Sequence, residues 1–461
     1  MTETPAPGRR SRAGSSGRRL DLTVVLAVLL PVAAVGLLAT AGTEPVEPEP
    51  RPPATVELTS ATLGCPTGLP GAPGVRVAST GDVAGEVSVG EEQATLEAGR
   101  SLRVDAPDPA VVRAGGDLAP GLVAGRSGTA PLVATDCPRP VAEQWFTGVG
   151  AGARHSSVLE LVNPNTGPAV ADVVVLGSAG QVEARELRGV LVPGGATRRL
   201  ELATLIPQEG ELALQVSTTR GRLTASVEDT EDRLGSAEPV TDWLGGQSEP
   251  LATSTLLGLP SGPGQRSLVL ANPGDDELRA ELRIVTADSV FAPQGLDEVR
   301  IAPRSTTRVP LTSPLQGAIA DGAYGVQVDA TGPVTASLRS VVRRDVSHAV
   351  PADPVSGRTV AVVPEGRKQL QLAGASAVGA VGVVARDADG REVASEKVEV
   401  TPGAGGTLDL PDSAVVVEVT PRRVSVLGSV LVTGTGAAVI RLHEPTTAGL
   451  VPQVDPGLPA R

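Results

Sequence analysis

The residues that could do chemistry in this chain are few and scattered. Its 461 residues include three histidines, His155, His348 and His443, and only two cysteines. No histidine has a second histidine, a cysteine or an acidic pair at the spacing of a metal site. The signatures G-x-S-x-G, S-x-x-K and H-E-x-x-H are absent from the sequence. We therefore expect no catalytic residue, no metal and no cofactor.

Carboxylates offer the one remaining route to catalysis. Glu160, Glu201 and Glu228 are candidate acid–base groups, but glycoside hydrolysis needs two carboxyls about 5–10 Å apart in one cleft. The acidic run 228–232 is interpreted as a solvated loop in preference to a calcium site. Asp387 and Gly390 begin like a calcium loop, but the later ligands are missing, so a hairpin turn is expected there.

Aromatic residues are rare, and three of them form a candidate binding surface. Trp145 and Phe146 precede a predicted strand, and Trp243 follows a predicted domain. Aromatic rings either fill apolar junctions or stack on sugar rings. The sequence leaves both interpretations open: a buried plug between domains or a platform for a carbohydrate.

The N-terminus suggests a compartment for the rest of the chain. Residues 1–21 form a basic tail, and residues 22–41 are an uncharged, mostly apolar run of membrane-spanning length. Arginines before this run place the N-terminus in the cytoplasm and the bulk outside. We expect a single-pass signal anchor in the cell membrane, with secretion after cleavage following Ala41 as the alternative. Residues 42–55 alternate Pro with Glu and predict an extended stalk.

The two cysteines fit that compartment. Cys65 and Cys137 both lie in the exported part, and an even cysteine count in an oxidising environment indicates a disulfide. Zinc binding is disfavoured because no histidine lies near either cysteine. A structural Cys65–Cys137 disulfide is the prediction.

The remaining elements are strands that repeat. Short Val- and Leu-rich runs of period two alternate with Gly and Pro signals, a pattern typical of antiparallel strands. Asn163 and Pro164 return as Asn272 and Pro273, 109 residues later, and both pairs are predicted structural turns. Six or seven strands per repeat predict an all-β chain of tandem immunoglobulin-like β-sandwiches, with a β-propeller as the alternative.

The repeats set the expected domain boundaries. Residues 56–141 are predicted to form a separate, disulfide-closed β domain. Residues 142–247 and 248–350 are two β-sandwich repeats, and residues 351–446 are a third, degenerate one. Residues 447–461 are predicted to be a flexible tail.

Taken together, these features resemble one family. The basic tail, the apolar run, the acidic Pro stalk, the two Cys-Pro pairs, Trp145-Phe146 before a strand and the repeated Leu-x-Asn-Pro units are similar to an actinobacterial domain of unknown function, number 5719. The resemblance covers nearly the whole exported part. It implies an actinobacterial envelope protein and carries over no catalytic residue.

Charge and motifs together limit the function. The net charge of −13 disfavours nucleic acid as a partner, because phosphate binding needs clustered positive charge. We expect a non-catalytic, membrane-tethered extracytoplasmic protein that binds an envelope protein or a cell-wall glycan, or acts as a scaffold. The alternative is an accessory or weak enzyme of cell-wall carbohydrate metabolism.

Overall fold

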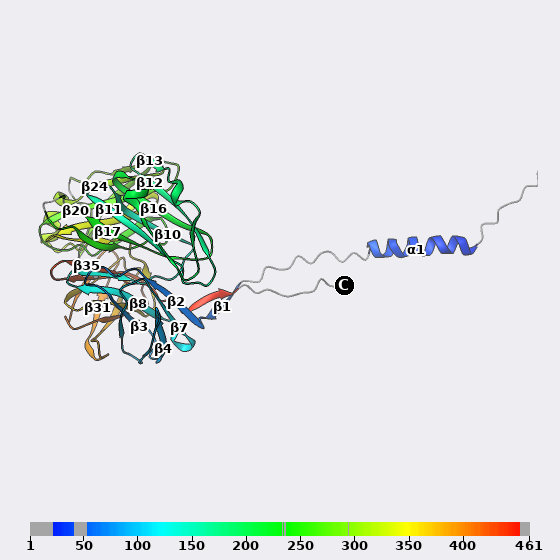
Figure 1. Ribbon diagram of the computed structural model, residues 1–461, viewed down its shortest axis with the longest axis horizontal. Helices are drawn as coiled ribbons and strands as arrows, with labels where there is room; N and C mark the ends of the chain where they lie inside the picture. Colours follow the sequence, from blue (N-terminus) through cyan, green and yellow to red (C-terminus); the bar gives the residue numbers. More distant parts are fainter. Residues whose placement is uncertain (1–21, 41–52, 233, 235–236, 294, 452–461) are drawn as a thin grey trace, which may run out of the picture. The chain divides into compact units, whose positions relative to one another are not determined.

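The structure is a computed structural model that describes residues 22–40, 53–232, 234, 237–293 and 295–451 (Figure 1). It has two parts, which we describe separately: a helix near the N-terminus and a compact body over residues 55–449. The predicted basic tail (1–21) and most of the predicted stalk (42–55) lie outside the described residues.

The helix α1 (Leu22–Thr40) contains Pro31 and lies within the apolar run 22–41. It has no acidic residue in its first turn and no basic residue in its last. In the described part of the chain, no helix is long and apolar enough to cross a membrane. The signal anchor therefore stays a prediction.

The first sandwich begins the body and consists of two four-stranded sheets. Their strand orders are β2-β7-β4-β5 and β6-β3-β8-β9. Buried and more exposed residues alternate along β7, so one face of its sheet is apolar and packs on the other sheet. The elements are β2 (Ser60–Cys65), β3 (Gly74–Ser79), β4 (Gly85–Val89), β5 (Glu92–Leu96), β6 (Leu102–Asp105), β7 (Ala110–Gly115), the short 3-10 helix η1 (Gly116–Leu118), β8 (Leu122–Thr129) and β9 (Leu132–Asp136).

The second sandwich repeats this pairing. Its sheets have the orders β13-β12-β16-β10 and β15-β11-β17-β18, and one residue pair, Ala151–Ser156, joins them through β10 and β11. The elements are β10 (Glu143–Ala151), β11 (His155–Val162), β12 (Ala169–Gly177), β13 (Gly180–Val182), η2 (Arg185–Leu187), β14 (Val190–Val192), β15 (Thr197–Glu201), α2 (Leu202–Leu205), β16 (Gln208–Arg220), β17 (Thr224–Glu231) and β18 (Val240–Leu244).

In the third sandwich a single long strand, β25, runs through both sheets. Its first half pairs with β19 and β21, and its second half pairs with β20 and β26. The elements are β19 (Leu251–Leu257), β20 (Gly264–Asn272), β21 (Leu278–Val285), β22 (Val290–Phe291), β23 (Val299–Ile301), β24 (Ser305–Pro310), α3 (Thr312–Ala320), β25 (Gly325–Val342) and β26 (Asp345–Ala349).

The fourth sandwich returns to two separate sheets. Their orders are β28-β33-β30-β31 and β32-β29-β34-β35, with β27 also beside β34. The strands are β27 (Pro354–Val355), β28 (Thr359–Val362), β29 (Arg367–Ala373), β30 (Gly379–Arg386), β31 (Glu392–Val400), β32 (Gly406–Leu410), β33 (Val416–Arg422), β34 (Val426–Thr433) and β35 (Ala437–Arg441).

All four sandwiches therefore share one pairing scheme. The count takes β13 and β14, which both lie beside β12, as one strand, and likewise β22 and β23 beside β21; it takes the two halves of β25 as two strands and leaves out β27. The first strand of each sandwich then pairs with the sixth, and the seventh pairs with the second. In an immunoglobulin domain the first strand lies in the sheet of the second, and the seventh lies beside the sixth. The chain is all-β as predicted, but its strand order is not the immunoglobulin order. Residues 56–141, predicted to be a separate domain, are a fourth copy of the repeat.

The four sandwiches close into a ring. Their last strands, β9, β18, β26 and β35, contact one another in turn, with β35 returning to β9. In Figure 1 the second and third sandwiches (green to yellow) lie above the first and fourth. The arrangement resembles a four-bladed propeller in which each blade is a whole sandwich. Each predicted repeat of about 110 residues therefore forms one blade of the ring.

Aromatic rings mark three of the four junctions of this ring. Trp243 packs with Leu69 and Val133 between the first two sandwiches, and Trp145 packs with Ala271 between the second and third. Between the third and fourth, the Tyr324 hydroxyl donates to the Leu372 carbonyl at 2.8 Å. At the closing junction, between the fourth and first sandwiches, a cluster of small aliphatic residues packs together: Ala78, Val123, Val360, Val362, Val415 and Val416.

The two ends of the body lie side by side. Strands β1 (Ala54–Glu57) and β36 (Ala448–Val451) form a two-stranded sheet, and the Leu58 N–H donates to the Thr447 carbonyl at 2.9 Å. The predicted flexible tail is therefore wrong for residues 448–451, because they pair with the start of the body. Residues 452–461 lie outside the described part.

Candidate functional site

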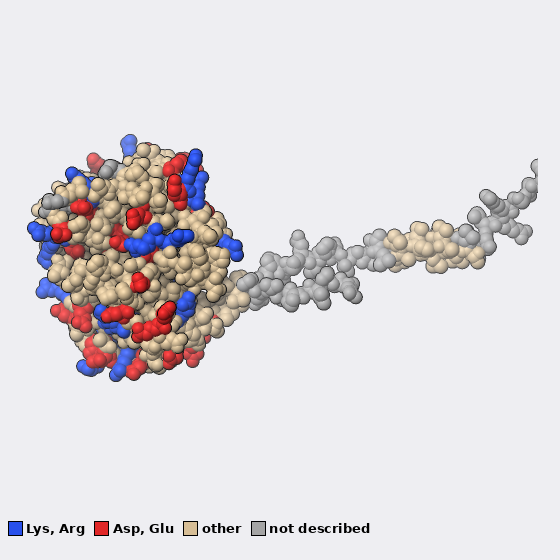
Figure 2. Space-filling model, viewed as in Figure 1, with Lys and Arg blue, Asp and Glu red and all other residues tan. Residues whose placement is uncertain are grey.

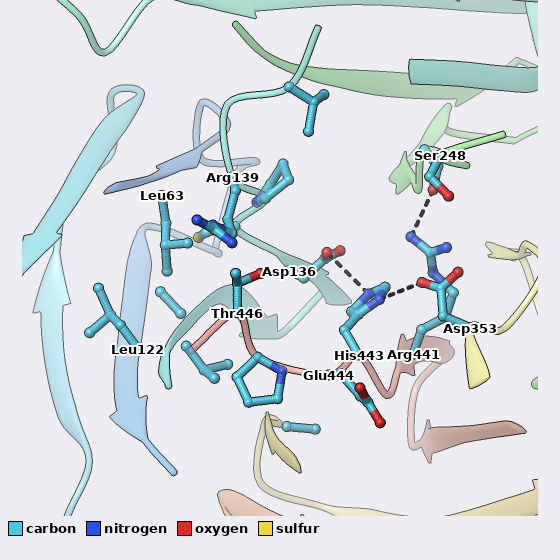
Figure 3. Close-up of a pocket in the computed structure, with 18 of the residues that line it drawn as sticks. Leu63, Leu122, Asp136, Arg139, Ser248, Asp353, Arg441, His443, Glu444 and Thr446 are labelled. Atoms are coloured by element: carbon cyan, nitrogen blue, oxygen red, sulfur yellow. Dashed lines mark hydrogen bonds and ion pairs between the residues drawn. The ribbon is translucent and has the colours of Figure 1, made fainter. Parts of the chain in front are cut away.

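A cavity of about 270 Å³ lies where the first, second and fourth sandwiches meet (Figure 3). Its walls are mainly aliphatic and include Leu63, Leu122, Val141, Val360, Val362 and Ile440. Its polar lining includes Asp136, Arg139, Glu143, Gln144, Asp353, Arg441, His443 and Glu444. Cavities at domain junctions with apolar walls and a few polar groups are the usual places for ligands.

The disulfide positions one side of this junction cavity. Cys65 ends β2, and Cys137 follows β9 in the opposite sheet of the first sandwich, so the predicted Cys65–Cys137 bond ties the two sheets together. Next to it, the Gly64 N–H donates to the Pro138 carbonyl at 2.9 Å. These contacts fix the segment that carries Asp136 and Arg139 into the cavity.

His443 links two carboxylates across the cavity. Its Nδ1 lies 2.8 Å from Asp353 Oδ2, and its Nε2 lies 3.3 Å from Asp136 Oδ2 (Figure 3). Burial and the charge of Arg441 oppose protonation, but the hydrogen bonds to Asp136 and Asp353 raise the pKa of His443 to about 9. Burial alone would raise the pKa of Asp353, but the hydrogen bond with His443 lowers it below its usual value. The three side chains therefore carry charge at neutral pH.

The other carboxylates of the cavity are also engaged. Glu143 accepts from Trp145 Nε1 at 3.0 Å and from Gln215 Nε2 at 2.9 Å. Glu444 accepts from the Ser356 hydroxyl and the Gly357 N–H at 2.7 and 2.8 Å. Because the four lining carboxylates all have protein partners, none is poised as a free acid or base.

Gln144 has a polar group that the protein itself does not use. Its Oε1 is buried and has no hydrogen-bond partner among the described residues. A buried acceptor without a donor is costly. Because this oxygen is buried, the structure does not expose it to the cavity that the residue lines.

A second histidine centre lies between the second and third sandwiches. Asp229 is fully buried on β17; His155 Nε2 lies 2.8 Å from its Oδ1, and His348 Nε2 lies 3.2 Å from its Oδ2. The Ser157 hydroxyl donates to the same carboxylate. Burial would raise the pKa of Asp229, but the charge of His155 and its hydrogen bond hold that pKa well below the usual value.

Glu211 and Arg339 complete this buried centre. Arg339 Nη2 donates to Glu211 Oε1 at 2.6 Å, and His155 Nδ1 lies 3.2 Å from Glu211 Oε2. Burial lowers the pKa of His155, but the neighbouring Asp229 charge outweighs it and raises that pKa to about 9. Besides the junction cavity, three further cavities lie in the described part of the chain, and this centre lines none of the four, so we interpret it as a clamp between two sandwiches.

Near the ring axis, β18 and β26 bring two more carboxyls together. Asp242 is buried, and burial together with the Asp345 charge raises its pKa well above the usual value. Burial also raises the pKa of Asp345 to about 6, although its carboxylate accepts from the Ala437 N–H at 2.8 Å. In the described part of the chain, no group of three or more His, Cys, Asp or Glu side chains could hold a metal ion.

The predicted aromatic binding surface is wrong, because its three side chains are buried. Trp145, Phe146 and Trp243 are 3%, 1% and 4% exposed. The two tryptophans fill domain junctions, which is the other interpretation that the sequence left open, and Phe146 lies in the core of the second sandwich.

The predicted Asn-Pro turns are closed by the asparagine side chains. Asn163 and Asn272 are fully buried, and each Nδ2 donates to backbone carbonyls across its turn. Each Oδ1 accepts from the N–H two residues later, at 3.1 Å for Asn163 and 2.9 Å for Asn272. Pro164 and Pro273 follow directly, where the chain leaves the strand.

The predicted acid–base glutamates Glu160 and Glu228 share one cation. Arg199 donates to Glu160 and Glu228 at 2.8 and 2.7 Å, and Glu201 lies exposed. None of the three lines the four described cavities.

The acidic run 228–232 is mostly not the solvated loop that the sequence predicts. Residues 228–231 lie in β17, and Asp229 points into the buried clamp described above. Asp387 and Gly390 form the predicted hairpin turn, since Asp387 Oδ1 accepts from the N–H groups of Asp389 and Arg391.

Sequence reasoning missed both histidine centres. Asp136, Asp353 and His443 come from three regions of the chain, and Asp229 and His348 lie in different sandwiches. No short motif links such residues, so only ring closure brings them together. Asp229 lies beside other acidic residues in β17, and Asp353 lies between β26 and β27, so no local pattern marks these positions.

The comparisons with known proteins agree on a family and add nothing on activity. The model of a family of unknown function, DUF5719, matches residues 98–411. No curated protein and no solved structure matches the chain. The matched region runs from the first sandwich to the fourth.

Proposed function

Because the chain belongs to this family of unknown function, its role has to be argued from the site, and we propose that it is a non-catalytic binding protein of the cell envelope. In this proposal the junction cavity takes an aliphatic side chain from an extended segment of a partner protein. One observation carries it: the cavity walls are aliphatic, and the four carboxylates at the cavity already have partners within the protein.

Two features favour a protein partner over a cell-wall glycan. Sugar rings are commonly held against aromatic faces, and no Trp, Tyr or Phe lines the four cavities described here. The junction cavity is also small: about 270 Å³, compared with roughly 300–1,000 Å³ for sites of drug-sized ligands. A side chain fits this volume better than an oligosaccharide does.

Two features favour the extracytoplasmic location that we propose with this role. Disulfides persist in oxidising compartments, and Cys65 and Cys137 are joined. The arginine-rich N-terminus before α1 favours export of the body. We propose a membrane-tethered protein, with secretion after cleavage following Ala41 as the alternative. A full-length, membrane-bound product on a blot supports the tether, and a product shorter by about forty residues in the medium overturns it.

Photo-crosslinking at the cavity rim tests the binding role. Ser248 and Thr446 line the cavity and are exposed, so each can be replaced by benzoylphenylalanine in the tagged full chain with little effect on folding. Both positions should give a crosslink to the same protein in the native cell. Thr447 and Val378, which are exposed but do not line the cavity, are the controls. Crosslinks that are absent at the rim, or equally strong at the controls, overturn the proposal.

The enzymatic alternative needs two carboxylates in one cleft. Glu160 and Glu228 meet at Arg199 but line none of the described cavities, so we do not favour it. Hydrolysis of wall glycan by the full chain, abolished by Glu228→Gln, would establish the enzyme and overturn the binding proposal.

A further inference from the structure

A second, more open cavity lies between the first and second sandwiches. It has a volume of about 500 Å³, and its lining includes Ser60, Thr62, Arg139, Asn165, Gly221 and Arg222. We call it the arginine groove. Unlike the junction cavity, it has no acidic residue in its lining.

The segments that carry the two arginines are held in place. Arg139 lies two residues after the disulfide-bonded Cys137, and Val141 pairs with Leu223 through two backbone hydrogen bonds of 2.9 and 3.2 Å. The Arg222 carbonyl accepts from Asn165 Nδ2 at 3.1 Å. The groove is therefore built on fixed backbone, which lowers the entropic cost of binding.

The Asn163 turn also supports this groove. Asn165 Nδ2 lies 3.2 Å from Asn163 Oδ1, and Arg113 Nη2 donates to the Pro164 carbonyl at 2.6 Å. Arg113 comes from β7, so the first sandwich holds the turn that positions Asn165. The turn thus has a use beyond ending a strand.

Within the part of the chain that the structure describes, the two arginines have no counter-charge. Over the visible face of the body, arginines and acidic side chains are interspersed (Figure 2), and many arginines form ion pairs. Among the described residues, no carboxylate lies within ion-pair distance of Arg139 or Arg222. Burial and the Arg222 charge both lower the pKa of Arg139, and no acidic neighbour opposes them.

The hydroxyls of the groove have no partner among the described residues either. Ser60 and Thr62 lie on β2, and no hydrogen bond joins either side chain to another described residue. Two guanidinium groups and two hydroxyls are thus free to donate into one groove. A phosphate group has more acceptor oxygens than a carboxylate, so it uses this set of donors more fully.

We propose that the arginine groove binds a phosphate group, with Arg139 and Arg222 as its charged donors and Ser60 and Thr62 as its neutral ones. The phosphate is either free in solution or part of a phosphodiester in a larger envelope molecule. Arg222 lines only this groove, whereas Arg139 lines the junction cavity as well. The test therefore rests on Arg222, and its result is separate from the crosslinking at Ser248 and Thr446.

Binding is measured by isothermal titration of the detergent-solubilised full chain at constant ionic strength. The probes are inorganic phosphate, dimethyl phosphate as a phosphodiester, and acetate as a carboxylate. We expect binding of at least one phosphate probe, and Arg222→Gln should weaken it about tenfold because one charged donor is lost. Arg300→Gln is the matched control, since Arg300 is exposed and lies in the third sandwich.

The probes separate the sources of the phosphate. Tighter binding of inorganic phosphate indicates a free anion, and tighter binding of dimethyl phosphate indicates a phosphodiester in a larger molecule. The proposal is overturned if neither phosphate probe binds, if acetate binds as tightly as phosphate, or if Arg222→Gln binds like the unaltered chain.

Discussion

The two histidine centres of the ring use the same residue types in different surroundings. At the His155 centre the Asp229 carboxylate is fully buried, and no described cavity reaches it. At the His443 centre the side chains are partly exposed, 32% for His443 and 42% for Asp353, and a cavity lies beside them. Burial makes the first centre a clamp between sandwiches, whereas the second holds a junction that still has room for a ligand. A histidine–aspartate pair can therefore hold two sandwiches together or border a cavity, and its exposure to solvent determines which.

Removing the buried carboxylate should have the largest effect. Asp229→Asn removes the main negative partner of the charged His155. Breaking a buried ion pair in this way lowers the unfolding free energy by about 3–5 kcal/mol. Denaturant unfolding of the full chain measures the loss. Asp275→Asn, at an 85% exposed carboxylate, is the control and should change stability by less than about 0.5 kcal/mol. Equal losses for the two variants would contradict the clamp.

Alkaline pH should weaken the same clamp. The folded pKa of His155, about 9, lies above its usual value of 6.5, so folding binds a proton between these two pH values. Its contribution is fully present below about pH 6.5 and is lost as the pH rises through about 9, which amounts to about 3 kcal/mol. Unfolding curves between pH 6 and 10 measure the slope. His155→Gln should flatten it, and an unchanged slope would mean that His155 is neutral in the fold.

Acid should act on Asp345 with the opposite sign to ordinary carboxylates. Because its folded pKa is raised to about 6, the folded state binds a proton that the unfolded chain does not bind until about pH 3.8. Stability should therefore rise modestly as the pH falls from 7 to 5. Asp345→Asn should remove that rise in thermal unfolding, and a fall in melting temperature over this range in the unaltered chain would contradict the assignment.

Removing the partly exposed Asp353 carboxylate tests the His443 centre in the same way. Asp353→Asn should cost at most about 1 kcal/mol, because water screens the pair with His443 and Asp136 stays in place. It should nevertheless reduce partner crosslinking from Thr446, since His443 loses its orienting contact. A loss as large as that of Asp229→Asn would show that both centres are clamps.

A variant that blocks the cavity should change the stability of the protein least of all. Thr446→Trp fills the rim from an exposed position and should change the unfolding free energy by less than about 0.5 kcal/mol. Partner capture by the full chain should fall well below that of Thr447→Trp, the neighbouring control. Equal capture by the two variants would remove the cavity from the binding site.

Local patterns predicted what is local in this fold. Period-two strands, the Asn163 and Asn272 turns, and the disulfide depend on near neighbours or on a single pair, and each could be read from residue types. The strand order could not, because exchanging the first and seventh strands between sheets leaves the periodicity unchanged. The His443 site was also hidden, since Asp136 and Asp353 reach it only when the ring closes. Trp145 and Trp243 show the same limit: the sequence could not decide between a plug and a platform.

Because the two ends of the body are adjacent, the chain could be joined there and opened elsewhere. Leu58 and Thr447 are hydrogen bonded, so a short linker could join them while the backbone is opened at an exposed turn elsewhere. Such a circular permutant would keep every sandwich and every junction. The chain could therefore begin at any of the four sandwiches, because the fold of the ring depends on which sandwiches are neighbours and not on which comes first.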